Sequence, residues 1–115
     1  MESELQPERI TYNKIVRDKV VAHLTDLGKE PESIEVGPEE ALELLKQKLI
    51  EEAQEVASAD SNEELIRECG DLQEVLDTVI KYAGVDPSIV SAVRKEKFEN
   101  RGGFDKPTKL ISSLP

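Results

Sequence analysis

Residues 49–72 read L-I-E-E-A-Q-E-V-A-S-A-D-S-N-E-E-L-I-R-E-C-G-D-L, and this stretch decides the fold. Apolar residues recur every three or four positions on both sides of residues 59–61, which is the spacing of amphipathic helices. Ser61 is followed three residues later by Glu64, the pattern of a capping box that starts a helix. The stretch therefore predicts two helices joined by a tight turn, and helices joined in this way are antiparallel neighbours.

The same helical spacing continues outward from this stretch in both directions. It predicts four helices, over residues 16–27, 38–59, 62–83 and 87–100. Gly28, Gly84 and Gly102 stand where helices end, and Asp86 and Pro87 form the start of the last helix. No strand pattern of convincing length occurs. The expected fold class is all-α, an antiparallel helical bundle.

Length and composition limit how this bundle is organised. The chain has 115 residues, the size of one domain. We expect a mobile arm at residues 1–10, a single domain at 11–105 and an irregular tail at 106–115. Hydrophobic residues make up 37% of the chain and aromatic residues 3%, which is a lean supply for a lone core. We therefore expect part of the apolar surface to be buried between subunits.

The charge and the cysteine count exclude several classes of protein. A net charge of −10 repels a nucleic-acid backbone, so duplex DNA or RNA is not an expected partner. A nucleotide substrate stays open, because a bound cation reverses the local field, and solubility is the other interpretation of the charge. Cys69 is the only cysteine, residues 1–9 do not resemble a signal peptide, and no apolar run approaches the ~20 residues that span a membrane. We expect a soluble cytoplasmic protein with no membrane partner.

Five acidic residues follow the apolar stripes of the two central helices. They are Glu51, Glu52 and Glu55, in the pattern E-E-x-x-E, and Glu68 and Asp71, in the pattern E-x-x-D. If the two helices pair through their apolar stripes, the five carboxylates converge, and that arrangement needs bound cations or raised pKa values. Oxygen ligands alone suit Mg²⁺, Mn²⁺ or Ca²⁺, and a site that also admits phosphate oxygens suits Mg²⁺ best.

The alternative interpretation of these acids is a hydrated seam whose charges are balanced by Lys46, Lys48 and Arg67. Other metal chemistries do not fit the sequence. A di-iron carboxylate bundle requires Glu-x-x-His motifs, whereas the only histidine, His23, lies far from both acid groups. No Cys–His zinc spacing and no G-x-x-x-x-G-K phosphate loop occur.

Four motifs in order resemble a known superfamily. E-E-A-Q-E at 51–55 and E-C-G-D at 68–71 are similar to the E-E-x-x-E and E-x-x-D signature of the all-α nucleoside triphosphate pyrophosphohydrolases, the MazG and phosphoribosyl-ATP pyrophosphohydrolase superfamily. Y-N-K-I-V-R-D-K-V at 12–20 resembles the opening of its small stand-alone branch. R-K-E-K at 94–97 with N-R-G-G-F at 100–104 resembles the basic ending of that branch. The likeness covers about residues 11–105.

The resemblance implies a function and roles for individual residues. Family members cleave the α–β phosphate bond of a nucleoside triphosphate or a related compound with Mg²⁺, and we expect Mn²⁺ to be a possible substitute. Carried over by position, Glu52, Glu55, Glu68 and Asp71 would bind the metal, and Glu51 would orient water or accept its proton. Glu51 and Glu52 are therefore the candidate catalytic residues. The resemblance and the lean core also imply a homodimer or higher homo-oligomer that completes a four-helix bundle.

Two groups of polar and basic residues are candidates for holding the phosphates of this substrate. The candidate substrate-binding residues are Lys14, Arg17, Lys19, Arg94, Lys97, Asn100 and Arg101. Arginine makes bidentate contacts with phosphate and lysine supplies a point charge. The first group, near residue 16, has an alternative role in fixing an acidic neighbour. The second group, near residue 100, also complements the dipole at a helix C-terminus.

The sequence thus favours a Mg²⁺-dependent pyrophosphohydrolase that converts a nucleotide-like triphosphate into a monophosphate and pyrophosphate, with house-cleaning of non-standard nucleotides as one such role. The alternative is a catalytically inactive nucleotide-binding protein or an acidic helical interaction module. The identity of the nucleotide is not encoded in any motif, since nothing indicates which aromatic side chain, if any, contacts the base.

Overall fold

The computed structural model describes residues 7–115, and within them the chain forms four helices and no strand. The helices are α1 (Val20–Asp26), α2 (Pro38–Ser58), α3 (Asn62–Tyr82) and α4 (Pro87–Arg101). The all-α fold class is therefore confirmed. Residues 1–6 of the expected N-terminal arm lie outside the described residues. None of the described helices is both long and apolar enough to cross a membrane.

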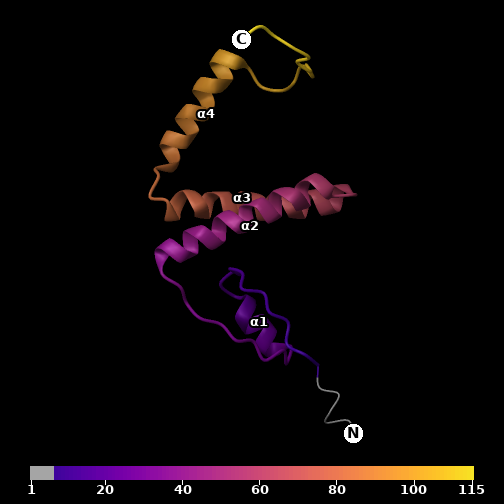
Figure 1. Ribbon diagram of the computed structural model, residues 1–115, viewed down its shortest axis with the longest axis vertical. Coiled ribbons are helices and arrows are strands. Elements are labelled where there is room, and N and C mark those ends of the chain that lie inside the picture. The colour runs from indigo at the N-terminus through magenta and orange to yellow at the C-terminus, as the bar shows by residue number, and fades with distance from the viewer. Residues whose placement is uncertain (1–6) are drawn as a thin grey trace.

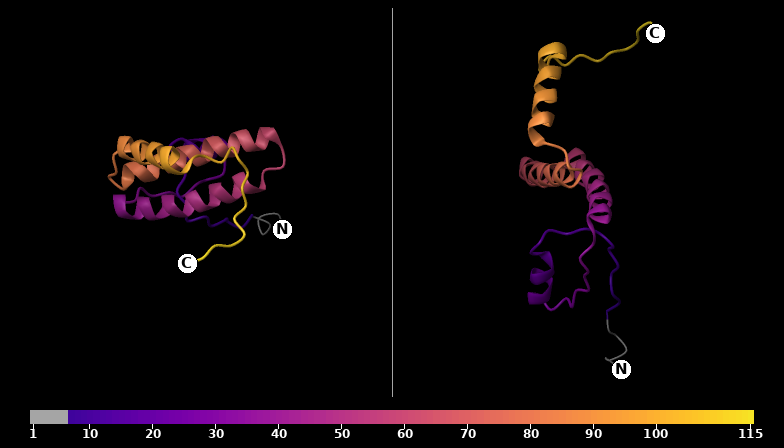
Figure 2. Two further views of the ribbon diagram at one scale, coloured as in Figure 1. Left: turned by 90° about the horizontal axis from the view of Figure 1, so that it is seen from above. Right: turned by 90° about the vertical axis from the view of Figure 1, so that its left-hand side faces the viewer.

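The antiparallel pair α2–α3 forms the centre of the molecule, with α1 and α4 on opposite sides of it (Figures 1 and 2). Both partners of the capping box act at the start of α3. The Glu64 amide donates to the Ser61 hydroxyl over 3.1 Å, and the Asp60 amide donates to the Glu64 carboxylate over 3.0 Å. The turn between α2 and α3 is thus fixed by local hydrogen bonds, and it places the E-E-x-x-E and E-x-x-D motifs opposite each other.

Replacing the cap residue is the direct test of this turn. Ser61→Ala is expected to lower the free energy of unfolding by about 1 kcal/mol, because it leaves the Glu64 amide without its partner. Urea denaturation followed by circular dichroism measures the change. Ser91→Ala, at an exposed position inside α4, is the matched control. An equal loss in both variants would show that the cap does not stabilise α3.

The core of this hairpin is small. Within the described residues the buried apolar side chains are those of Ala41, Leu45 and Val75. The apolar side chains of Leu65 and Leu76 on α3 stay exposed. The reason is geometric, since two helices cover only one side of each other. The remaining apolar surface of α3 has no cover within one chain.

The first helix is shorter than predicted. The expected helix covered residues 16–27, whereas α1 begins at Val20, residues 12–17 have no regular secondary structure and residues 18–19 form a turn. We name residues 12–19 the strap. Lys14 and Arg17 pair with acidic side chains of α2 and α3, and these contacts hold the strap across the hairpin. Cations at a helix start would also oppose the helix dipole, which disfavours continuing α1 in the N-terminal direction.

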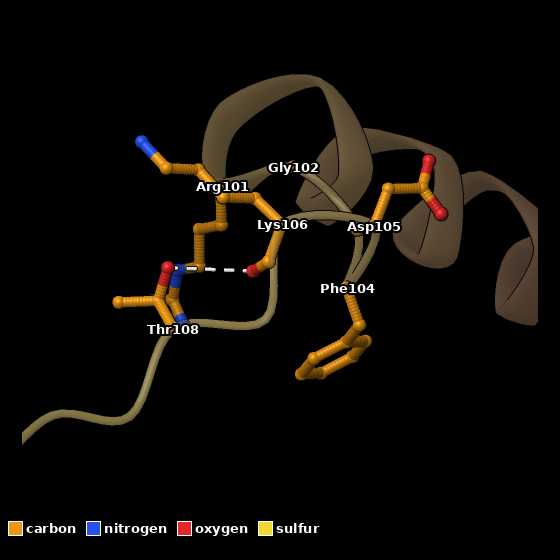
Figure 3. Close-up of a pocket in the computed structure, with 7 residues that line it drawn as sticks. Arg101, Gly102, Phe104, Asp105, Lys106 and Thr108 are labelled. Atoms are coloured by element: carbon orange, nitrogen blue, oxygen red, sulfur yellow. Dashed lines mark hydrogen bonds between the residues drawn. The ribbon is translucent and has the colours of Figure 1, made fainter.

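Helix α4 leaves the hairpin after a tight turn and ends close to where it was predicted to end. The Asp86 carboxylate caps it by accepting from the Ser88 amide over 2.9 Å, and this hydrogen bond lowers the pKa of Asp86. Gly102 ends it with a φ of 79°. Phe104 lies just beyond this glycine and does not fold back onto the core. Its side chain is 99% exposed and points outward from the turn, because no other element packs over the chain there (Figure 3).

The single chain is too extended for its size. Its radius of gyration is 20.0 Å, whereas a compact domain of this length has about 13 Å. Its accessible surface is 10822 Å², whereas a folded monomer of 12.8 kDa exposes about 6,300 Å². The single chain therefore has a surface excess, meaning that it exposes more surface than a compact monomer of its mass.

Candidate functional site

Three carboxylates meet where α2 faces α3. Glu52 and Glu55 stand on α2 one helical turn apart, and Glu68 reaches them from α3. One oxygen atom of each carboxylate lies within 4.8 Å of the others. We name these three residues the acid cluster. The capped turn at Ser61 sets the register that brings them together.

The acid cluster is incompletely neutralised by the protein. Glu52 is only 6% exposed, and one of its oxygens lies 3.7 Å from the Lys48 ammonium. Its other oxygen, Oε2, is buried and makes no hydrogen bond with any described residue, and the same is true of Oε2 of Glu68. The seam interpretation therefore leaves two of the four oxygens of these two residues buried and without a partner.

Burial and the closeness of the three carboxylates change the proton affinity of Glu52 and Glu68. Burial, followed by the charge and hydrogen bonding of Glu55, raises the pKa of Glu52. Hydrogen bonding with Glu55 is the largest cause of the raised pKa of Glu68, with burial and the neighbouring carboxylates adding to it. Without a cation, the protein holds its carboxylates together by favouring their protonated forms. A divalent cation with oxygen ligands would supply the same neutralisation at neutral pH.

The metal-free protein is therefore expected to lose stability as the pH rises. The folded-state pKa values of Glu52 and Glu68 lie above the ordinary 4.5, so the folded state holds extra protons in that range. The stabilising effect of these extra protons is complete below pH 4.5. It is lost as the pH rises through the raised pKa values of Glu52 and Glu68. Thermal denaturation in EDTA at about pH 5 and about pH 7.5 measures this difference.

The double variant Glu52→Gln/Glu68→Gln is the control for this pH dependence, because it removes both titrating groups and should flatten the difference. Adding Mg²⁺ at the higher pH should restore the melting temperature of the wild type alone. Equal pH dependence in the wild type and in the double variant would contradict this assignment.

The other two predicted acids are turned toward the strap. Lys14 donates to the Glu51 carboxylate over 3.2 Å, and Arg17 donates to the Asp71 carboxylate over 2.8 Å. Among the described residues the acid cluster is thus formed by three of the five predicted acids. Asp71 stays close enough for its charge to raise the pKa of both Glu52 and Glu68.

The predicted substrate-binding residues divide into two groups in space. Lys14 and Arg17 lie beside the acids and bind them, and Lys19 directly precedes α1. Arg94, Lys97, Asn100 and Arg101 stand on α4, which extends away from the hairpin on the side opposite α1 (Figure 1). Within one chain, the structure therefore does not bring the α4 residues to the acid cluster.

Some neighbours of the acid cluster were not identified as site residues from the sequence. Lys48 was considered only as one of three possible charge partners, although its i, i+4 spacing to Glu52 was a usable signal. Asp18, Glu74 and Thr78 line a cavity beside Glu52 and were not considered. No local pattern could have found them, since this cavity exists only where the strap packs on α2 and α3.

Two long antiparallel helices that turn carboxylates toward each other define an all-α protein with an acidic centre. A comparison with protein-family models identifies the particular family, because the model described as phosphoribosyl-ATP pyrophosphohydrolase matches residues 17–97. This match covers more than half of the chain, so the chain belongs to the phosphoribosyl-ATP pyrophosphohydrolase family. It is a hydrolase that acts on phosphoric anhydrides, and the predicted resemblance is confirmed. Searches of curated proteins and of solved structures gave no match.

Proposed function

We propose that the chain is a Mg²⁺-dependent nucleoside triphosphate pyrophosphohydrolase that cleaves the α–β phosphate bond and yields a nucleoside monophosphate and pyrophosphate. The observation that carries the proposal is the pair of buried carboxylate oxygens, Oε2 of Glu52 and of Glu68, that have no partner among the described residues. A buried carboxylate oxygen without a partner is expensive, so a protein that keeps two such oxygens in one cluster has a use for a cation there.

The residues proposed to hold Mg²⁺ are Glu52, Glu55, Glu68 and Asp71, with Mn²⁺ as a possible substitute. All four offer carboxylate oxygens, which are the ligands that these ions prefer. The bound ion neutralises the phosphate charge and makes a water molecule more acidic. Arg17 fixes the Asp71 carboxylate over 2.8 Å and thereby keeps it beside the acid cluster.

The chain's own residues would perform the remaining steps. Glu51 stands next to Glu52 on α2, and we propose that it orients the attacking water and accepts its proton. Lys14, 3.2 Å from Glu51, holds this carboxylate in position and lies close enough to share a phosphate oxygen. Phosphoryl transfer depends mainly on positioning and charge stabilisation, so these polar contacts account for much of the catalysis.

The second basic group, on α4, has a role in substrate binding only in the proposed oligomer. Arg94, Lys97, Asn100 and Arg101 stand on α4, which extends away from the α2–α3 hairpin of its own chain. We propose a homodimer or higher homo-oligomer in which α2 and α3 of two copies form a four-helix bundle and these residues bind substrate phosphates. The surface excess of the single chain supports this assembly. House-cleaning of non-standard nucleotides in the cytoplasm is the role proposed for such an enzyme.

Product analysis tests the reaction. Incubating the full chain with ordinary, deoxy and damaged nucleoside triphosphates in Mg²⁺ should release pyrophosphate and the matching monophosphate, and EDTA should stop the release. Anion-exchange chromatography separates this outcome from β–γ cleavage, which gives a diphosphate and inorganic phosphate. Metal-independent nucleotide binding without turnover across the panel would favour the inactive binding module instead.

A further inference from the structure

A cavity of about 410 Å³ lies between the strap and the α2–α3 hairpin. This volume falls in the range of sites that hold small organic ligands. The cavity shares Glu52 and Asp71 with the proposed metal site, so a ligand in it would lie directly beside the acids. A triphosphate held at the acids would place its nucleoside end within reach of this space.

One part of the cavity wall is apolar. Leu45 of α2 and Val75 of α3 are both almost fully buried and line it, and Val16 and Val20 line it from the strap side. Tyr82, the last residue of α3, also lines the cavity and is half exposed. An apolar wall with an aromatic ring suits the faces of a nucleobase better than it suits a phosphate or a sugar alone.

The polar groups of the cavity are mainly acceptors. The two cations that line it are already paired, Arg17 with Asp71 and Lys48 with Glu52. The Thr78 hydroxyl donates to the Glu74 backbone carbonyl over 2.8 Å, which leaves its lone pairs available.

Two carboxylates complete the lining. The carboxylates of Asp18 and Glu74 face no ion-pair or hydrogen-bond partner within residues 7–115. Ionised carboxylates only accept hydrogen bonds, so a ligand that fits this lining must present hydrogen-bond donors, and the amino group of a nucleobase is such a donor.

We propose that this cavity binds the nucleoside end of the substrate and selects a base with an exocyclic amino group over a base with a keto oxygen at the same position. The inference rests on the proposed function, because it takes the acids as the phosphate end of the site. Glu74 and Asp18 accept from the amino group, in the way that carboxylates accept from cytosine N4. A second phosphate is excluded from the cavity, since both carboxylates repel it.

The first test compares two nucleotides whose pyrimidines differ at C4, which carries an amino group in cytosine and a keto oxygen in uracil, and at N3, which accepts in cytosine and donates in uracil. Isothermal titration with the non-hydrolysable α,β-methylene analogues of CTP and UTP, in Mg²⁺, measures binding without turnover. The wild type is expected to bind the CTP analogue about tenfold more tightly. Glu74→Gln should remove most of this preference, because the side-chain amide of the variant can also donate a hydrogen bond to the keto oxygen of the UTP analogue. Asp77→Asn removes a carboxylate from the exposed surface of the same helix and should retain it.

The second test fills the cavity from the strap side. Val16→Trp should weaken binding of the CTP analogue at least about tenfold, whereas Val85→Trp should not. The two valines are 45% and 44% exposed, and only Val16 lines the cavity. Titration with Mn²⁺ alone reports the state of the proposed metal site in each variant, and it should be unchanged.

These measurements distinguish failure of the proposed nucleoside cavity from failure of the proposed function on which it rests. Equal binding of both analogues by the wild type, or unchanged nucleotide affinity in Val16→Trp with intact Mn²⁺ binding, overturns the nucleoside cavity and leaves the proposed function standing. A Val16→Trp variant that changes the sedimentation mass but not the nucleotide affinity shows that the cavity seats a second copy, which also overturns the inference. Absent Mn²⁺ binding in the wild type overturns the proposed function itself.

Discussion

Glu52→Gln is expected to reduce pyrophosphate release at least about a hundredfold, the scale of losing a charged group that acts on the transition state. Glu52 is the most buried member of the acid cluster, and one of its oxygens has no protein partner. The amide keeps the shape of the side chain but removes the negative charge that attracts a cation. Coupled measurement of pyrophosphate release and titration with Mn²⁺ should show that activity and metal affinity fall together.

Two controls make this result specific to the acid cluster. Glu43→Gln changes an exposed carboxylate on the same helix and should leave both activity and metal binding unchanged. In EDTA, Glu52→Gln should melt at the same temperature as the wild type or higher, because it removes a poorly neutralised buried charge. A variant that stays folded and hydrolyses nucleotides at the wild-type rate would rule out Glu52 as a metal ligand.

The central hairpin was predictable from the sequence because its signals are local. The capping pair Ser61 and Glu64 lies three residues apart, and Asp86 caps α4 from the adjacent position. Such hydrogen bonds form whatever the rest of the chain does, so the starts of α3 and α4 fell at the expected residues. Helical spacing and the antiparallel turn were sufficient to predict that Glu52 and Glu68 lie close together.

The partners of the remaining acids depend on contacts between distant parts of the chain. Lys14 and Glu51 are 37 residues apart, and Arg17 and Asp71 are 54 residues apart. Helical periodicity describes which residues share a face, but it carries no information on which distant segment will cover that face. Residues 16–19 of the strap were therefore predicted as the first turn of a helix, and the cavity beneath the strap could not be predicted.

Val93→Glu is expected to disrupt the proposed subunit assembly, and this is the second variant with a large expected effect. Helix α4 has 15 residues, and an isolated helix of this length is marginal in water. Ile89 and Val93 lie one turn apart on one face of α4, and both are exposed in the single chain. A second copy that covers this face would account for its apolar character and for the surface excess of the chain.

Sedimentation equilibrium and circular dichroism test the assembly together. The wild type should sediment as a dimer or a larger oligomer, and Val93→Glu should shift toward the monomer mass with a loss of helix signal from α4. Pyrophosphate release should fall in parallel, because α4 carries the proposed phosphate-binding residues Arg94 and Arg101. Ser91→Glu adds the same charge on the opposite face of the helix and should change neither mass nor activity. A wild type that sediments as a monomer with full activity would rule out the assembly, because the acid cluster of one chain would then be sufficient for catalysis.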